Sequence, residues 1–327
     1  MGNSSCPLQP SSATTVALPV IYSCLCPAGS FGNILAAWIF SRRTSTKRTQ
    51  HIYLANLATA NLLVCTTMPF LAAYFARGSE WTYDSVECKI ASHLGTFFMH
   101  VSMYVTILIL CSTALSQYAT LKRNSNAQYS QAVNENFYIC VLDKFRQQKF
   151  AKYLCIIVWL AVICITVTAV TYNVQERTVE HEICYNIKVE AGEYTARIAG
   201  FIATAWFFAS FMTVSLSYYC LTRHLKKIQK NTCIGEKHLI YSRVKRNILV
   251  IQVVLTVCFL PCHIFRPIFY VLLTNDCPRL NYLVEIKNFL TCLAAAKSSL
   301  DPVIILLLDK TYKKSLYALF TKSTPEH

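Results

Sequence analysis

The chain has 327 residues, of which 54% are hydrophobic and only 14% are charged, whereas about a quarter of the residues are charged in a typical soluble domain. Together with a mean hydropathy of +0.37 and several apolar runs of about 20 residues, this composition indicates a membrane protein. The net charge of +15 is distributed in a way that argues against nucleic acid as a partner, and the sixteen cysteines are too scattered for a small disulfide scaffold.

Residues 1–16 form a polar tail without the basic segment and apolar core of a cleavable signal peptide. Asn3-Ser4-Ser5 is a glycosylation sequon, so Asn3 is expected to carry a glycan if this end is extracellular. Hydropathy then predicts an all-α protein, with a bundle of membrane-spanning helices over residues 17–308 and a last segment, 309–327, on the inner side. Seven spans are expected, near residues 17–41, 51–76, 86–120, 151–173, 194–222, 244–273 and 282–308.

Basic residues are concentrated on one side of these spans. Segments on that side carry 22 Lys and Arg but 5 Asp and Glu, whereas the other side carries 8 and 10. The basic side is cytoplasmic by the positive-inside rule, so the N-terminus is expected outside the cell. We predict a multi-pass protein of the plasma membrane, in which the basic run 223–228 also favours contact with anionic membrane lipids.

Two cytoplasmic segments have partly apolar patterns. Residues 137–142 form an apolar patch between polar stretches, which fits either a short interfacial helix or a docking surface for a partner. After the seventh span, residues 310–320 have the pattern of a short amphipathic eighth helix on the inner membrane surface.

The sixth span has features that a simple membrane helix lacks. Pro261 removes a backbone donor and should kink the helix. Phe259, His263 and Arg266 are spaced to share one helix face, and ionisable groups within a span are often functional. The pattern predicts a ligand pocket about 10 Å above a bend, since seven residues separate Phe259 from Arg266 at 1.5 Å each.

Motifs in most of the spans resemble those of rhodopsin-like G-protein-coupled receptors, and the resemblance covers nearly the whole chain. The resemblance implies a seven-transmembrane receptor that binds a small molecule and signals through heterotrimeric G proteins, without cofactor, metal or catalytic residues. The matching residues are Gly32-Asn33, residues 56–63, Trp81 before Cys88, Ser116-Gln117-Tyr118 at the Asp-Arg-Tyr position, Trp159, Cys258-Phe259-Leu260-Pro261 and Ser299-Leu300-Asp301-Pro302.

The outer end of the sixth span narrows the resemblance to the purinergic-receptor-like branch. His263-Ile264-Phe265-Arg266 is similar to the His-x-x-Arg of those receptors, and Lys287 stands where they place another ligand-binding cation. This implies an anionic ligand, such as a nucleotide, a lysophospholipid or a fatty-acid-like molecule, with Tyr104 as a further contact. In the alternative, Arg266 or Lys287 pairs with Glu285 or with an acidic residue within 176–193 and closes the mouth without a ligand.

Two disulfides are implied by the same resemblance. They would join Cys88 to Cys184 and Cys6 to Cys277, all of which are expected on the extracellular side, where exposed thiols persist poorly. The alternative for Cys6 is a free or intermolecular thiol.

The resemblance also predicts an unusual polar core. Related receptors usually carry Asp in place of Asn61, and this carboxylate holds a sodium ion. Here Lys297 stands four residues before Asp301, within reach on one helix. We expect the Lys297 ammonium to replace sodium in a cage of Asn61, Thr106, Ser298 and Asp301; in the alternative, Lys297 points elsewhere in the bundle.

Several residues that related receptors use for activation are replaced. Gln117 stands in place of the arginine that contacts the G protein, and Ser116 in place of its acidic partner. Three further replacements are Ile305 for tyrosine, Leu255 for phenylalanine and Ser210 for proline, whereas Tyr118, Tyr218, Phe259, Pro261 and Pro302 are retained. Coupling is therefore expected to be weak, atypical or constitutive.

Two other classes of protein were weighed against the receptor. A transporter or proton pathway could use Lys297, Asp301 and His263, but the chain has no internal repeat of the kind that transporters often show. An enzyme is disfavoured because no nucleophile–base arrangement or metal-ligand spacing is present.

Overall fold

The computed structural model describes residues 9–42, 49–78, 96–126, 137–177, 194–231, 235–272 and 277–321. All regular secondary structure in these ranges is helical, which confirms the predicted all-α fold. The elements are η1 (Ala13–Ala17), α1 (Leu18–Arg42), α2 (Thr49–Ala76), α4 (Thr96–Asn126), α5 (Phe137–Lys144), α6 (Gln148–Arg177), α8 (Tyr194–Asn231), α9 (Gly235–Val254), η4 (Leu255–Phe259), α10 (Leu260–Val271), α11 (Cys277–Leu308) and α12 (Lys310–Thr321).

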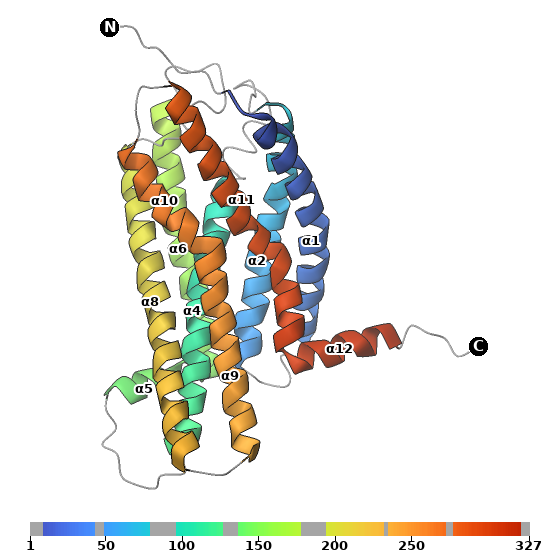
Figure 1. Cartoon of the computed structure of the whole chain (residues 1–327), viewed down its shortest axis with the longest axis vertical. Coiled ribbons are helices and arrows are strands. Elements are labelled where there is room, and N and C mark those ends of the chain that lie inside the picture. Colours follow the sequence, from blue (N-terminus) through green and yellow to red (C-terminus); the bar gives the residue numbers. More distant parts are fainter. Residues whose placement is uncertain are drawn as a thin grey trace, which may run out of the picture.

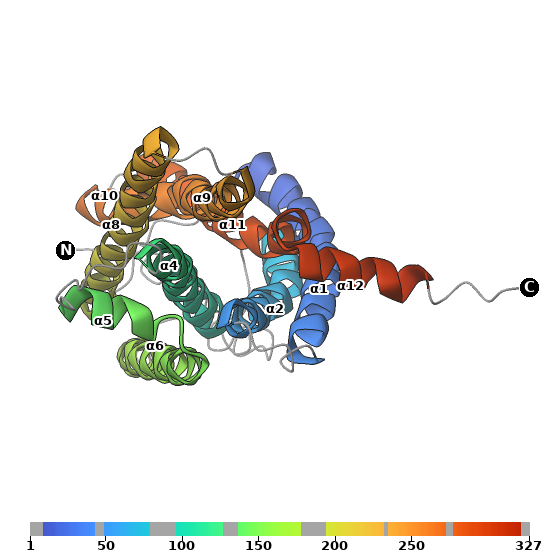
Figure 2. The same cartoon turned by 90° about the horizontal axis from the view of Figure 1, so that it is seen from below.

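Seven helical stretches in the described residues are long and apolar enough to cross a membrane, as predicted. They pack as an upright bundle (Figure 1), and the view along the bundle places α4 among α2, α6, α8 and α9 (Figure 2). Of the seven, α4 has the largest buried share, because neighbours surround it. The buried apolar side chains of the main core come mostly from this helix, α2 and α6, and α8 and α9 add further ones.

Several predicted span ends differ from the structure, and the starts of the first and seventh spans are two of them. The first span starts at Ala13 rather than 17, because the π-helical turn η1 continues into α1. The seventh span starts at Cys277 rather than 282. Its first turn is polar and was missed by hydropathy, but it contains Pro278, which is favourable in the first turn of a helix.

The sixth span is interrupted where Pro261 predicts a kink. Here α9 and α10 are joined by η4, a π-helical turn in which the Leu260 N–H donates to the carbonyl of Leu255. Pro261 has no N–H of its own to give, and π turns and prolines are the usual causes of bends in helices. The axes of α9 and α10 accordingly differ in direction (Figure 1).

The short helix expected at residues 137–142 is present as α5. The Thr49 hydroxyl at the start of α2 donates to the carbonyl of Arg146 just after α5. An ion pair of 2.6 Å between Arg146 and Asp143 stabilises the same corner. A partner-docking role for this segment stays a prediction.

Helix α12 leaves the end of α11 and runs away from the bundle (Figure 1). Tyr312 and Ser315 are buried on the side facing the bundle, whereas Lys313 and Lys314 are exposed. The Tyr312 ring stacks on Phe40 of α1 with centroids 5.6 Å apart. This polarity agrees with the amphipathic pattern, and a position on the inner membrane surface stays a prediction.

Glycines allow α1 to approach α11 closely. A Cβ atom at Gly32 would lie 2.6 Å from the Cβ and Cγ atoms of Pro302, and one at Gly29 would lie 2.6 Å from the Ser299 hydroxyl oxygen. A proline ring cannot rotate away from such a contact. The close approach is therefore specified by the absence of a side chain, as is common between membrane helices.

We predict that Gly32→Val lowers the unfolding temperature (Tm) of the full-length protein in detergent, with a cost of about 1–3 kcal/mol from overpacking. Ala28→Val is the matched control, because Ala28 lies one turn earlier on α1 and is exposed. Equal Tm values for the two variants would contradict the close contact with Pro302.

Candidate functional site

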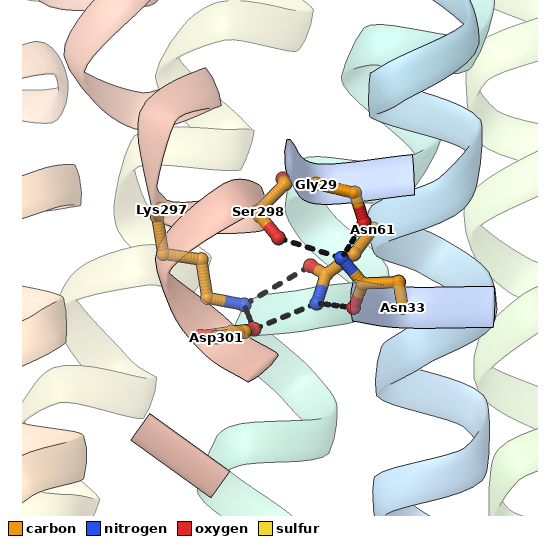
Figure 3. Close-up of polar contacts among 6 residues, drawn as sticks. All are labelled: Gly29, Asn33, Asn61, Lys297, Ser298 and Asp301. Carbon is orange, nitrogen blue, oxygen red and sulfur yellow. Dashed lines mark hydrogen bonds and ion pairs between the residues drawn. The ribbon is translucent and has the colours of Figure 1, made fainter. Parts of the chain in front are cut away.

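A buried polar network joins three helices in the middle of the bundle (Figure 3). The Lys297 ammonium forms an ion pair with Asp301 one turn further along α11 and donates to the Asn61 side-chain oxygen on α2 at 3.3 Å. The Asn61 amide donates to Asp301 at 2.8 Å and to Asn33 of α1 at 2.9 Å. Each helix thus contributes a polar side chain that contacts the next.

Burial makes this network energetically consequential. Lys297 and Asp301 are only 1% and 3% exposed. A single ion at such a position costs several kcal/mol, and removing one partner of a buried pair leaves that cost uncompensated. Burial of either charge is therefore tolerated only while the other charge is present.

The structure supplies a connection that was absent from the predicted cage. Asn33 donates to the backbone carbonyls of Gly29, at 2.8 Å, and Ser298, at 2.7 Å. Ser298, a predicted member of the cage, thus takes part through its main-chain carbonyl. The Gly32-Asn33 motif was visible in the sequence, but the long-range contact from α1 to α11 was not.

Thr106 does not behave as predicted. It is buried on α4, but no hydrogen bond within the described ranges joins it to Lys297, whose polar partners there are Asn61 and Asp301. The alternative in which Lys297 points elsewhere in the bundle does not agree with these contacts.

The network also lies near the bend in the sixth span. The thiol of Cys258, in η4, is within electrostatic reach of both Lys297 and Asp301. Phe259 beside it is buried in the main core. The charged pair and the π turn therefore share one neighbourhood.

A second polar group lies nearer the outer end. Arg266 of α10 is half-buried and donates to the Tyr104 hydroxyl of α4. His263, one turn below Arg266, is fully buried, and its ring stacks on Phe207 of α8 with centroids 4.1 Å apart. The structure thus brings together three of the predicted ligand contacts, and it adds Phe207.

The contacts of His263 identify which nitrogen carries hydrogen. Nδ1 lies 2.8 Å from the carbonyl oxygen of Phe259, which can only accept, so Nδ1 is the donor. In the neutral ring Nε2 is then an acceptor. It has no hydrogen-bond partner within the part of the chain that the structure describes.

Lys287 approaches the same group from α11. Its ammonium lies 5.5 Å from the centre of the Phe269 ring, in the range of a cation–π contact. The Cys262 thiol is within electrostatic reach of both Lys287 and Arg266. Both cations therefore lie near α10, and their convergence on one ligand stays a prediction.

Glu285, the expected competitor for these cations, has contacts with the N-terminal segment. Its carboxylate accepts from the backbone N–H of Ser11 at 2.6 Å and from the Thr14 hydroxyl at 2.9 Å. These bonds fasten η1 and the residues before it to α11. The acidic residues of 176–193 lie outside the residues with described side chains.

Gly200 gives Tyr270 access to the backbone of α8, which sequence reasoning missed. A Cβ atom there would be 2.7 Å from the Tyr270 hydroxyl. Tyr270 is also within electrostatic reach of Arg266. The glycine therefore helps to hold α10 beside α8 at the level of the Arg266 group.

Two inner positions at which related receptors carry charged side chains hold neutral ones here, Ser116 and Gln117. Gln117 and Ser116 are buried on α4, and Ile305 is buried on α11. The Gln117 side-chain oxygen has no hydrogen-bond partner within the described ranges. Tyr118 and Tyr218 are partly buried against the main core, which also contains Leu255.

Most of the predicted extracellular modifications fall on residues that the structure does not describe, namely Asn3, Cys6, Cys88 and Cys184. Cys277 is disulfide-bonded. Because none of the other cysteines with described side chains forms a disulfide, its partner lies outside the residues with described side chains. Among the described residues, no cluster of three or more His, Cys, Asp or Glu side chains could bind a metal.

These features together define a class of protein. The family of 7 transmembrane receptors of the rhodopsin type matches residues 32–305. The chain belongs to this family, which is a family of receptors and not of enzymes, and it is a multi-pass membrane protein. The resemblance inferred from the motifs is confirmed.

Individual relatives match over almost the full length. Probable G-protein coupled receptor 82 of Homo sapiens is 50% identical over 331 residues, covering 100% of this chain and 98% of the relative. The Mus musculus protein of the same name is 51% identical, covering 99% and 100%. Probable G-protein coupled receptor 34 of Mus musculus is 26% identical, covering 96% of this chain and 79% of the relative.

The buried pair predicts a strong energetic coupling. Asp301→Asn should cost about 3–5 kcal/mol of stability because it strands the Lys297 charge, and Lys297→Met/Asp301→Asn should recover much of that loss. Asp143→Asn is the matched control, because its ion pair with Arg146 is partly exposed and should contribute at most about 1 kcal/mol. Thermal unfolding in detergent measures these three variants together with Lys297→Met, and additive effects of the two single changes at Lys297 and Asp301 would contradict the pairing.

Proposed function

We propose that this receptor lies in the plasma membrane with its N-terminus outside, senses an anionic small molecule and signals through heterotrimeric G proteins. The ligand is a nucleotide or a lysophospholipid-like molecule. Family membership supports a receptor with a ligand, and relatives named as G-protein coupled receptors support the output. The distribution of Lys and Arg supports the orientation.

Arg266 is the observation that carries the anionic ligand. Its guanidinium is half-buried, and its hydrogen-bond partner within the described residues is the neutral hydroxyl of Tyr104. Buried charges are normally paired with an opposite charge. A phosphate or carboxylate would supply that charge and fit the two-pronged guanidinium, while Lys287 would add a second, movable cation.

His263 adds a second requirement for the ligand. Its Nε2 is a buried acceptor without a partner in the described region, one helical turn below Arg266. A ligand that places a hydroxyl or N–H group about 4.5 Å below its anionic group, at 1.5 Å per residue for three residues, would satisfy this nitrogen. Nucleotides and lysophospholipids both combine an anionic group with hydroxyl groups.

The bend below provides a route from the ligand to the inner end. Arg266 and His263 belong to α10, which is joined to α9 by η4. A ligand that binds one orientation of α10 more tightly than another would shift the population of bends. The movement would appear at the inner end of α9, where a G protein would contact the receptor.

The extracellular modifications are part of the same proposal. A Cys6–Cys277 disulfide would hold the N-terminal tail against α11, where Ser11 and Thr14 bind Glu285, and a Cys88–Cys184 disulfide would hold a second loop over the pocket. Asn3 would carry a glycan on the outer side.

The ligand site is tested by screening nucleotides and lysophospholipids with nucleotide exchange on a purified G protein as the readout. Arg266→Ala/Lys287→Ala should raise the half-maximal concentration of an active compound at least tenfold, because a charge-assisted hydrogen bond contributes about 1.5–3 kcal/mol. Tyr104→Phe should have a smaller effect in the same direction.

Arg279→Ala is the matched control, since Arg279 is an exposed cation near the outer end of α11. It removes one positive charge from the same end of the bundle without touching Arg266. An agonist whose potency is equal in the wild type and the double variant would rule out the cationic pocket.

A second candidate function is a receptor-like protein with weak, atypical or constitutive coupling. The neutral side chain at 117 supports it, because Gln117 is buried, its oxygen has no hydrogen-bond partner among the described residues, and an amide cannot supply the charge of arginine. Ile305 likewise lacks the hydroxyl of the tyrosine that related receptors carry at this position.

Gln117→Arg separates the two functions. If coupling is weak for lack of this charge, the variant should raise ligand-stimulated nucleotide exchange severalfold. Gln147→Arg is the control, since Gln147 is exposed on the same side and adds the same charge outside the bundle. High basal exchange in the wild type, unchanged by Gln117→Arg, would instead establish constitutive coupling.

A further inference from the structure

Two oxygen atoms from different helices converge on the Lys297 ammonium (Figure 3). One belongs to the Asp301 carboxylate, and the other is the Asn61 side-chain oxygen, 3.3 Å from the ammonium nitrogen. Carboxylate and amide oxygens are the ligands that hard cations prefer in proteins. The ammonium therefore occupies the position in which these oxygens would hold a metal cation.

The orientation of the Asn61 oxygen does not depend on Lys297 alone. The Asn61 amide nitrogen donates to Asn33 at 2.9 Å and to Asp301 at 2.8 Å, which uses both of its hydrogens. Asn33 is oriented in turn by the carbonyls of Gly29 and Ser298. Without the ammonium, these contacts would keep the two oxygens directed at the same position.

The ammonium is a permanent occupant. It is attached to the same helix as Asp301, one turn away, and is 1% exposed. A dissolved cation would have to displace a covalently attached one and would then lie beside a second positive charge in a region of low dielectric constant. Charge and space both exclude it.

We propose that Lys297 is a built-in cation. Its ammonium fills a monovalent-cation site formed by Asn61 and Asp301, so that the resting bundle does not depend on sodium from solution. Because η4 packs against α11, the helix that carries this cation also contacts the turn at which the sixth span changes direction. The resting arrangement of α2, α11 and η4 is therefore held at any sodium concentration.

The experiment compares Tm values of the full-length protein in detergent, in sodium chloride and in N-methylglucamine chloride of equal ionic strength. The wild type should give the same Tm in both salts. Lys297→Met should be less stable but should gain a saturable rise of about 3 °C or more when sodium reaches roughly ten times its Kd, because a ligand that binds only the folded state raises Tm.

Lys297→Met/Asp301→Asn is the matched control, since it has the same side chain at 297 but lacks the carboxylate. Its Tm should not respond to sodium. If Lys297→Met fails to fold, Asn61→Asp/Lys297→Asn decides the question, because it restores a negative charge beside Asp301 and should also acquire a saturable response.

Two results would overturn the proposal. One is a saturable sodium-dependent rise of Tm in the wild type, which would mean that the site accepts a dissolved cation despite Lys297. The other is a folded Lys297→Met protein with equal Tm in the two salts, which would mean that Asp301 takes up a proton and that no cation site exists. The first result needs no variant to fold.

Discussion

The ion pair between Lys297 and Asp301 is the constraint on which the packing of the bundle centre depends. Both charges lie on α11, and Asn61 of α2 contacts each of them. Moving α11 along α2 would break these contacts to buried charges at a large cost. Asn61 and Asn33 extend the constraint to α2 and α1 through amides whose hydrogens are all used. Gly29 and Gly32 remove side chains at the same level. Polar contact and close approach therefore support each other between α1 and α11.

The outer group has the opposite character. Arg266 contacts a phenol instead of a carboxylate, and His263 keeps an acceptor without a partner in the described region. The charges at the centre thus compensate each other, because Lys297 pairs with Asp301. At the outer end, a ligand could pair with the Arg266 charge and donate to His263 Nε2. A ligand that binds there would act on α10, while the neighbouring α11 stays joined to α1 and α2 through Asn33 and Asn61. The π turn between α9 and α10 lies between these two regions.

Local sequence features predicted much of this arrangement. Apolar length identified the seven spans, Pro261 indicated the bend, and the spacing of four residues placed Lys297 beside Asp301. Contacts between distant segments could not be predicted in this way. The bond from Asn33 to the Ser298 carbonyl depends on how closely α1 and α11 pack, and the fit of Tyr270 at Gly200 depends on the direction of α10. Thr106 was placed in the cage by the resemblance, and within the described residues it is buried without a hydrogen bond to Lys297.

The π turn at Leu255–Phe259 also has a consequence for rotation. A π turn contains one residue more than an α turn would use, and one residue corresponds to about 100° around a helix axis. Closing this turn into regular α-helix would rotate the outer segment relative to the inner one, not merely tilt it. His263 would leave the Phe207 ring and Arg266 would leave Tyr104. The extra residue thus determines how far α10 is rotated about its axis, and therefore which of its side chains face α4 and α8.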